Sequence, residues 1–181
     1  TVVFKKDRFS VTIMRITITR HGETIKNQKK IIQGNLPGKL SEEGIEQAKK
    51  LAFRLKDEKF DFVYSSDLAR AKDTTKEIIK FHPDVPVEYT QDLRERNWGE
   101  FEGKTKEEAV IMGKDGFIVV GKEPKNGESL NQLFDRAKDF VYRTLEKHPN
   151  DSVLFVCHNG IKKAFVCAIT GKKAEDIKST A

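Results

Sequence analysis

The strongest constraint on the fold is a regular alternation of strand-like and helix-like segments along the chain. Short apolar stretches rich in β-branched residues predict strands, and longer stretches with apolar residues three or four positions apart predict helices. We expect strands at 14–19, 60–64, 86–89 and 152–157, and helices at 41–57, 67–81, 105–112, 128–148 and 160–170. This order predicts an α/β fold, a three-layer α/β/α sandwich around a mainly parallel sheet.

The apolar pattern also predicts which faces are buried. The face of 41–57 is expected to hold Ile45, Ala48, Leu51, Ala52 and Leu55, and that of 67–81 to hold Ala71, Thr74, Ile78 and Phe81. The stretch 152–157 has no polar interruption after its first residue, which is typical of a strand buried on both faces. We expect one catalytic domain over 14–181, preceded by an extension at 1–13 to which we assign no function.

Charge and composition exclude several classes of protein. The 181 residues carry 34 Lys and Arg against 28 Asp and Glu, a net charge of +6 that attracts anions. The basic residues are scattered as pairs with acids between them, so we expect no nucleic-acid partner. No apolar run is long enough to span a membrane and no leader-like segment opens the sequence, so we expect a cytoplasmic protein with no membrane partner. Cys157 and Cys167 lie in apolar surroundings and are predicted to be reduced core thiols.

Polar groups that suit catalysis follow three of the expected strands. In open α/β sheets, ligands bind at the carboxyl ends of the strands. Arg20-His21-Gly22 follows the first strand, Ser65 to Arg70 follows the second, and His158-Asn159-Gly160 follows the strand at 152–157. The other histidines, His82 and His148, precede prolines at helix ends and are expected on the surface.

Two histidines and two arginines at one sheet edge suit phosphoryl transfer through nitrogen. Neutral imidazole is a competent nucleophile near pH 7, and arginines hold phosphate oxygens in bidentate geometry. No paired ligand spacing such as H-E-x-x-H or C-x-x-C is present, so we expect no metal. Cys157 is disfavoured as a nucleophile paired with His158, because neighbours on a strand point to opposite faces.

The motifs resemble one known family. Arg20-His21-Gly22-Glu23-Thr24 is similar to the signature of the histidine phosphatase superfamily, the phosphoglycerate-mutase-like clan. The remaining motifs follow in the order of that family: Asn27, Gln33-Gly34, Leu40 to Gly44, Ser65 to Ala71, Leu93 to Gly103, Gly127 to Ser129, and Val156 to Gly160. The resemblance covers nearly the whole chain and implies a phosphoglycerate-mutase-like fold.

The resemblance implies a role for each site residue. His21 would be the nucleophile that becomes phosphorylated, and Glu95 would protonate the leaving oxygen and then activate water. Glu102, in the same loop, is the competing carboxylate. The phosphate pocket would contain Arg20, Arg70, His158 and Asn27. Gln33, Gly34, Asn159 and Gly160 would complete the substrate site.

The family contains phosphatases and mutases, which share the phosphohistidine step. The segment between Glu95 and Gly127 is shorter than in the cofactor-dependent mutases, and Ile25-Lys26 replaces the usual Trp before the pocket Asn. We therefore expect a metal-independent phosphatase that needs no cofactor and acts on a small phosphorylated metabolite. The alternatives are a phosphoglycerate mutase and a non-catalytic module that binds phosphorylated ligands. Family members usually continue beyond the second histidine with a further strand, whereas this sequence ends 23 residues after His158.

Overall fold

The sheet contains the four predicted strands and one more. The structure is a computed structural model that describes residues 2–7, 10–105, 107–109 and 124–178. Within them the strand order is β1-β2-β5-β3-β4, and β2, β5, β3 and β4 are parallel. The strands are β1 (Val2–Asp7), β2 (Ser10–Arg20), β3 (Phe62–Ser66), β4 (Val87–Thr90) and β5 (Ser152–Cys157). The mainly parallel sheet is therefore confirmed.

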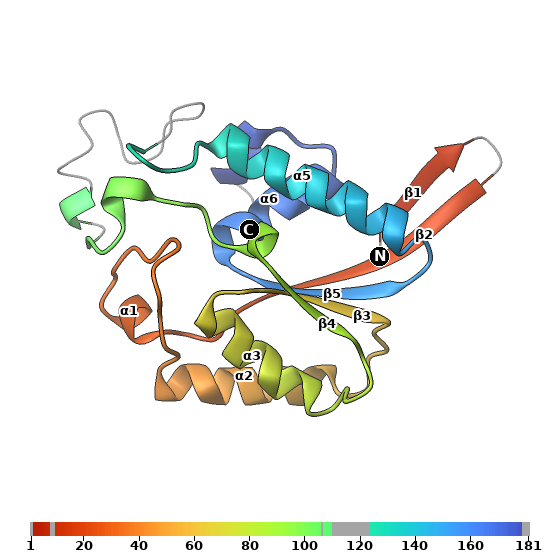
Figure 1. The fold of residues 1–181 in the computed structure, drawn as a ribbon, viewed down its shortest axis with the longest axis horizontal. Coiled ribbons are helices and arrows are strands. Elements are labelled where there is room, and N and C mark those ends of the chain that lie inside the picture. The colour runs from red at the N-terminus through yellow and green to blue at the C-terminus, as the bar shows by residue number, and fades with distance from the viewer. Residues whose placement is uncertain (1, 8–9, 106, 110–123, 179–181) are drawn as a thin grey trace.

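Helices cover both faces of this sheet (Figure 1). One face carries α2 (Glu42–Leu55) and α3 (Ala69–Ile79), and the other carries α5 (Leu130–Lys147) and α6 (Asn159–Ile169). The connecting segments contain α1 (Ile25–Gln28) and the 3-10 helices η1 (Gln91–Leu93), η2 (Gly99–Phe101) and η3 (Ala174–Lys178). This arrangement confirms the three-layer sandwich. None of the helices in the described ranges has the length and apolar character that a membrane span requires.

The central strand β5 supplies side chains to both cores. Val153, Phe155 and Cys157 pack in a cluster with α5 and α6, whereas Leu154 and Val156 pack with α2 and α3. Successive side chains of a strand point to opposite faces, so an uninterrupted apolar strand fits only between two helical layers. The strand is buried on both faces, as predicted. Both cysteines are free and buried, which confirms them as core thiols.

The prediction that His82 and His148 lie on the surface was wrong. Each side chain is only 7% exposed. His82 Nε2 donates to Leu55 O at 3.1 Å, a carbonyl at the end of α2 that has no partner within the helix. His148 contacts the Tyr64 hydroxyl at 3.0 Å through Nε2 and Asp151 Oδ2 at 2.9 Å through Nδ1. Both imidazoles are buried because they complete hydrogen bonds at the ends of secondary structure.

Two apolar residues that were expected in the core are exposed. Phe81 is 45% exposed because α3 ends at Ile79, so Phe81 lies in the following turn and not on the helical stripe. Ile45 is 41% exposed and lines a surface groove between α2 and α3. The rest of the predicted stripes is buried or partly buried.

The segment expected to be an extension is partly in the sheet. β2 begins at Ser10, and β1 pairs antiparallel with it, with Val2 opposite Met14. Of the helix expected at 105–112, residues 107–109 are helical, Thr105 forms an isolated bridge with Ile31, and 106 and 110–112 lie outside the described residues. The other predicted helices and strands begin and end within two residues of their expected bounds.

Candidate active site

The two histidines at the strand ends meet at the carboxyl edge of the sheet. His21 follows β2, and its backbone N–H donates to Cys157 O, the last carbonyl of β5, at 3.1 Å. His158 follows β5 and is the N-cap residue of α6. Their ring centroids are 4.9 Å apart. Parallel pairing of β2 with β5 thus brings together two residues that lie far apart in the sequence.

The environment of His21 keeps its imidazole neutral. Nδ1 lies 2.6 Å from Gly22 O, and because a carbonyl only accepts, Nδ1 carries the proton and Nε2 keeps its lone pair. Burial, followed by the positive charge of Arg70, lowers the pKa of His21 from 6.5 to about 3, although the hydrogen bond to Gly22 opposes this shift. Near pH 7 this side chain is a neutral base with a free nitrogen, which suits a nucleophile.

His158 is neutral as well, and both of its ring nitrogens have protein partners. Arg70 Nε donates to His158 Nδ1 at 3.2 Å, which places the proton on Nε2, and Nε2 donates to Ser66 Oγ at 2.8 Å. Burial is the main cause that lowers the pKa of His158 well below its usual value, and the nearby Arg70 adds to it. His158 therefore orients Arg70 next to His21.

Arg70 is the most deeply buried cation of the site, with 1% of its side chain exposed. Besides its bond to His158, it donates to Leu36 O at 3.0 Å and to Gly34 O at 2.7 Å. Burial lowers its pKa to about 10, so the guanidinium stays positively charged near pH 7. Three of its five N–H donors are used by these bonds, which leaves two for a ligand.

Two further residues, Arg20 and Asn27, are predicted for the phosphate pocket, and Gln33 is predicted for the substrate site. Arg20 is exposed at the end of β2, and its charge contributes to the lowered pKa of both histidines. Asn27 Oδ1 accepts from Thr24 N at 3.1 Å and from Thr24 Oγ1 at 2.8 Å, at the start of α1. Gln33 Nε2 donates to the same hydroxyl at 2.8 Å, and Gln33 Oε1 is buried without a partner in the described residues. Thr24, to which sequence reasoning gave no role, therefore links Asn27 to Gln33.

Glu95 is held at the N-terminus of α6. Its Oε2 accepts from Gly160 N at 3.0 Å, and its Oε1 accepts from Ile161 N at 3.3 Å and from Arg96 N at 2.8 Å. A side chain at Gly160 would collide with Oε1, so glycine lets the carboxylate reach the helix end. Two of these donors are N–H groups of the first turn of α6, which have no partner within the helix and hold the Glu95 carboxyl group in place. Asn159, the exposed first residue of α6, lies next to this contact.

Glu102, the competing carboxylate, has a different environment. Its Oε1 accepts from Asn35 N at 2.9 Å and from Trp98 N at 3.0 Å. A side chain at Gly34, whose φ is +49°, would collide with this carboxylate. Glu102 therefore joins the loop at 34–35 to the loop at 98 and leaves the start of α6 to Glu95.

The other nucleophile considered from the sequence, Cys157, is unsuited to the role. Its side chain is fully buried, and burial raises the pKa of its thiol far above the usual range. In the described ranges, no group of three or more His, Cys, Asp or Glu side chains is arranged to hold a metal ion.

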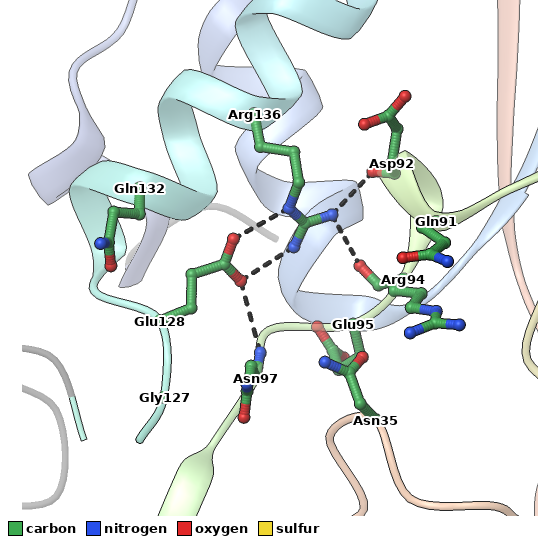
Figure 2. A pocket seen from close by; sticks show the side chains of 10 residues that line it. All are labelled: Asn35, Gln91, Asp92, Arg94, Glu95, Asn97, Gly127, Glu128, Gln132 and Arg136. Carbon is green, nitrogen blue, oxygen red and sulfur yellow. Dashed lines mark hydrogen bonds and ion pairs between the residues drawn. The ribbon is translucent and has the colours of Figure 1, made fainter. Parts of the chain in front are cut away.

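A cavity of about 460 Å³ opens beside Glu95, and Figure 2 shows its lining. It lies between the segment after β4, the start of α5 and the loop that contains Asn35. Sequence reasoning assigned no role to Arg136, which crosses one wall and pairs with Glu128 at 2.8 Å. One signal was available: Arg136 is three residues after Leu133 and four before Phe140, so it shares a face with two core positions of α5.

The comparisons with known proteins agree with this geometry. A family model of the histidine phosphatase superfamily (branch 1) matches residues 16–181. The chain belongs to this superfamily. Phosphoglycerate mutase-like protein 4 of Arabidopsis thaliana is 33% identical over 183 residues, which is 96% of this chain and 80% of that protein.

Other similar proteins of the superfamily are named as phosphatases. Fructose-2,6-bisphosphatase TIGAR of Bos taurus is 43% identical over 72% of this chain, which spans half the length of that relative. A metal-independent phosphoserine phosphatase of Arabidopsis thaliana is 37% identical over 87% of this chain and 69% of its own length. The structure of the alpha-ribazole phosphatase from Shigella flexneri superimposes with a TM-score of 0.83 at 28% identity and covers 92% of this chain and 84% of that one. These relatives confirm the prediction of a phosphoric monoester hydrolase of the histidine phosphatase type.

Proposed function

We propose that the chain hydrolyses small phosphorylated metabolites through a phosphohistidine on His21 and without a metal ion. The observation that carries this proposal is the state of His21. It is a neutral imidazole whose Nδ1 proton is held by Gly22 O, which leaves Nε2 free to attack. Arg20 and Arg70 supply positive charge next to it.

The chemistry divides into two balanced steps. In the first, the lone pair of His21 Nε2 forms a bond to phosphorus, the ester P–O bond breaks, and Glu95 gives a proton to the leaving oxygen. In the second, Glu95 takes a proton from water, the water oxygen bonds to phosphorus, and the P–N bond breaks to release phosphate. His21 returns to its neutral form and Glu95 to its protonated form.

Three observations support the residue roles. Arg70 retains two N–H donors and a positive charge, which can hold phosphate oxygens and stabilise the charge that develops in the transition state. Glu95 is bound at the start of α6 near His158, whereas Glu102 is engaged by two backbone N–H groups of neighbouring loops. One relative is named as a metal-independent phosphatase, which supports the same property here.

The phosphatase is favoured over the two alternatives. The relative named as mutase-like keeps phosphoglycerate mutase as the second candidate. A non-catalytic phospho-ligand module would not need a buried histidine with a lowered pKa and a free Nε2.

A turnover assay with an aryl phosphate tests the proposal. We expect hydrolysis that persists in a chelator, is lost in His21→Asn, and is retained in His82→Gln, which changes a buried histidine outside the site. Activity that disappears in chelator and returns with Mg²⁺ or Zn²⁺ would contradict the metal-independent mechanism. Interconversion of 3-phosphoglycerate and its 2-isomer at a rate above hydrolysis would replace the phosphatase with the mutase.

A further inference from the structure

Glu95 lines the cavity of about 460 Å³ described above, and it is the group that protonates the leaving oxygen in the proposed mechanism. In that mechanism the phosphoryl group is held near His21 and Arg70, so the leaving group lies next to Glu95 and this cavity is a candidate site for it. The chemistry of the lining therefore determines which leaving groups are accepted, and this inference rests on the proposed function.

Arg136, the first of two cations in the lining, uses four of its five N–H donors in bonds to the protein. Its Nε and Nη2 donate to the two carboxylate oxygens of Glu128, each at 2.8 Å. Its Nη1 donates to Asp92 O at 2.7 Å and to Arg94 O at 3.0 Å, as Figure 2 shows. A bidentate pair with two further carbonyl bonds leaves Arg136 a single unused N–H donor. It serves to hold the backbone next to Glu95.

Arg94, the second cation, is paired in the same way. Its Nε and Nη2 donate to the carboxylate oxygens of Asp67 at 2.7 and 2.6 Å. The pair lowers the pKa of Asp67 and raises that of Arg94. Arg94 keeps three unused N–H donors, but the carboxylate of Asp67 already neutralises its charge, so the pair offers a ligand anion no net positive charge.

The charges of the described lining are already paired or neutral. Glu128 is paired with Arg136 and Asp92 with Arg143, and Glu95 carries a proton when substrate binds in the proposed mechanism. A second phosphate or a carboxylate on the leaving group would therefore find no unpaired cation among the described lining residues. A charge that leaves water without gaining an opposite charge is bound at a large cost.

The remaining polar groups suit hydroxyls. The side chains of four amide residues line the cavity: Asn35, Gln91, Asn97 and Gln132. Asn35 Oδ1 is buried and has no hydrogen-bond partner among the described residues, so it is an acceptor available to a ligand donor. A hydroxyl both donates and accepts hydrogen bonds, so it can bind either the oxygen or the nitrogen of a side-chain amide, and it carries no charge.

We propose that this cavity binds the leaving group and selects uncharged groups that carry several hydroxyls, such as a sugar or another polyol. It discriminates against leaving groups with a second phosphate or a carboxylate. The discrimination comes from the prior pairing of Arg94 with Asp67 and of Arg136 with Glu128, which neutralises the two cations among the described lining residues.

The test compares substrates that share a phosphomonoester and differ in the charge of the leaving group. Ribose 5-phosphate and glucose 6-phosphate give uncharged leaving groups, whereas fructose 1,6-bisphosphate and 3-phosphoglycerate give anionic ones. We expect kcat/KM to be at least about tenfold higher for the uncharged pair, because an anionic leaving group loses water without gaining an opposite charge. An aryl phosphate measured in parallel reports the basic hydrolytic activity.

A charge introduced into the lining makes the test specific. Gln91 is exposed on η1 and lines the cavity. Gln91→Arg should lower the ratio of kcat/KM for uncharged substrates to kcat/KM for anionic substrates by about tenfold. Gln91→Met, of similar size and without charge, should not lower it. Asn131→Arg adds the same charge at an exposed position of α5 that does not line the cavity, and it should leave the ratio unchanged.

The outcomes separate this inference from the proposed function. Faster hydrolysis of the bisphosphate or of 3-phosphoglycerate, with the aryl phosphate also hydrolysed, would overturn the inference and leave the phosphatase intact. An equal effect of Asn131→Arg and Gln91→Arg would show that the selectivity arises from overall charge, and it would also overturn the inference. Failure of the folded protein to hydrolyse any ester, the aryl phosphate included, would overturn both.

Discussion

The histidine centre and the cavity beside Glu95 use arginine in opposite ways. In the histidine centre, Arg70 is 1% exposed, contacts no carboxylate through a hydrogen bond in the described structure, and keeps two donors for a ligand. In the cavity, Arg94 and Arg136 are each bound to a carboxylate in bidentate geometry. Where the neighbours are carbonyls and an imidazole, the arginine keeps its positive charge uncompensated by a hydrogen-bonded carboxylate, and where a carboxylate is within reach that charge is neutralised.

The two regions also differ in how the fold builds them. The histidine centre is placed by the ends of β2, β5 and β3, which parallel pairing fixes at one edge of the sheet. The cavity lies among connecting segments and the first turns of α5. The residues of the proposed chemistry are thus held by the sheet edge, and the proposed selectivity resides in connecting segments, which tolerate sequence change more readily than the elements they join.

Arg70→Lys should have the largest effect and separates the two uses of arginine. Arginine bonds His158 and the loop at 34–36 through its planar guanidinium and still has N–H donors left for phosphate. Lysine keeps the positive charge but lacks this planar group. We expect kcat for an aryl phosphate to fall by about 10²-fold, the typical cost of losing a preorganised donor. The exposed Arg54→Lys is the matched control and should retain full activity. Activity of a folded Arg70→Lys within about twofold of the parent would remove Arg70 from the site.

The buried histidines should make the histidine centre the acid-sensitive region. In the folded chain the pKa of His21 is lowered from 6.5 to about 3, so between these pH values the unfolded chain binds more protons. The free energy of unfolding therefore falls as pH drops below 6.5, by about 2 kcal/mol for His21 between pH 7 and pH 5. His158, whose pKa is lowered for the same reason, adds to this loss.

Urea unfolding at the two pH values measures this effect. His21→Asn should lose less stability between pH 7 and pH 5 than the parent, because the titrating group is gone. Gln91→Met, a change in the cavity, should lose as much as the parent. An equal loss in the parent and in His21→Asn would show that His21 is not held neutral by burial.

Arg136→Lys should have a smaller effect, because Arg136 acts on the reaction only through the backbone next to Glu95. The variant loses the fork to Glu128 and the bonds to Asp92 O and Arg94 O. We expect kcat to fall by about tenfold for an alkyl phosphate, whose leaving oxygen needs a proton, and by less for an aryl phosphate. Arg143→Lys, on the same helix and in an exposed pair with Asp92, should be near the parent value. Equal losses on both esters would indicate general damage and not a misplaced proton donor.

The sheet-edge residues could be predicted from the sequence because each follows a recognisable strand. Arg20-His21 and His158 lie at the ends of strands, Arg70 lies in the first turn of the helix that follows β3, and parallel strands end at one edge. Burial of Cys157 followed from the same pattern. The positions of these residues therefore follow from the local sequence and from the rule that parallel strands end at the same edge of a sheet.

The cavity and the buried histidines could not be predicted in this way. Arg136 and Glu128 are eight residues apart, and their pairing depends on how the segment at 92–97 passes over α5. His82 and His148 look like surface residues because each precedes a proline, but His82 bonds the carbonyl of Leu55 at the end of α2 and His148 bonds the hydroxyl of Tyr64 on β3. Contacts between segments that share no periodic pattern of residues cannot be recognised from the sequence.

The phosphorylated intermediate gives the most direct test of the account. Glu95→Gln keeps the size of the side chain and removes the proton donor and base, so the second step should slow more than the first with an activated aryl ester. After a rapid acid-free quench with labelled substrate, we predict label on His21 that is labile in acid and stable in alkali, and no label in the His21→Ala control. Label mapped to a serine, to Cys157 or to His158 in place of His21 would contradict the mechanism.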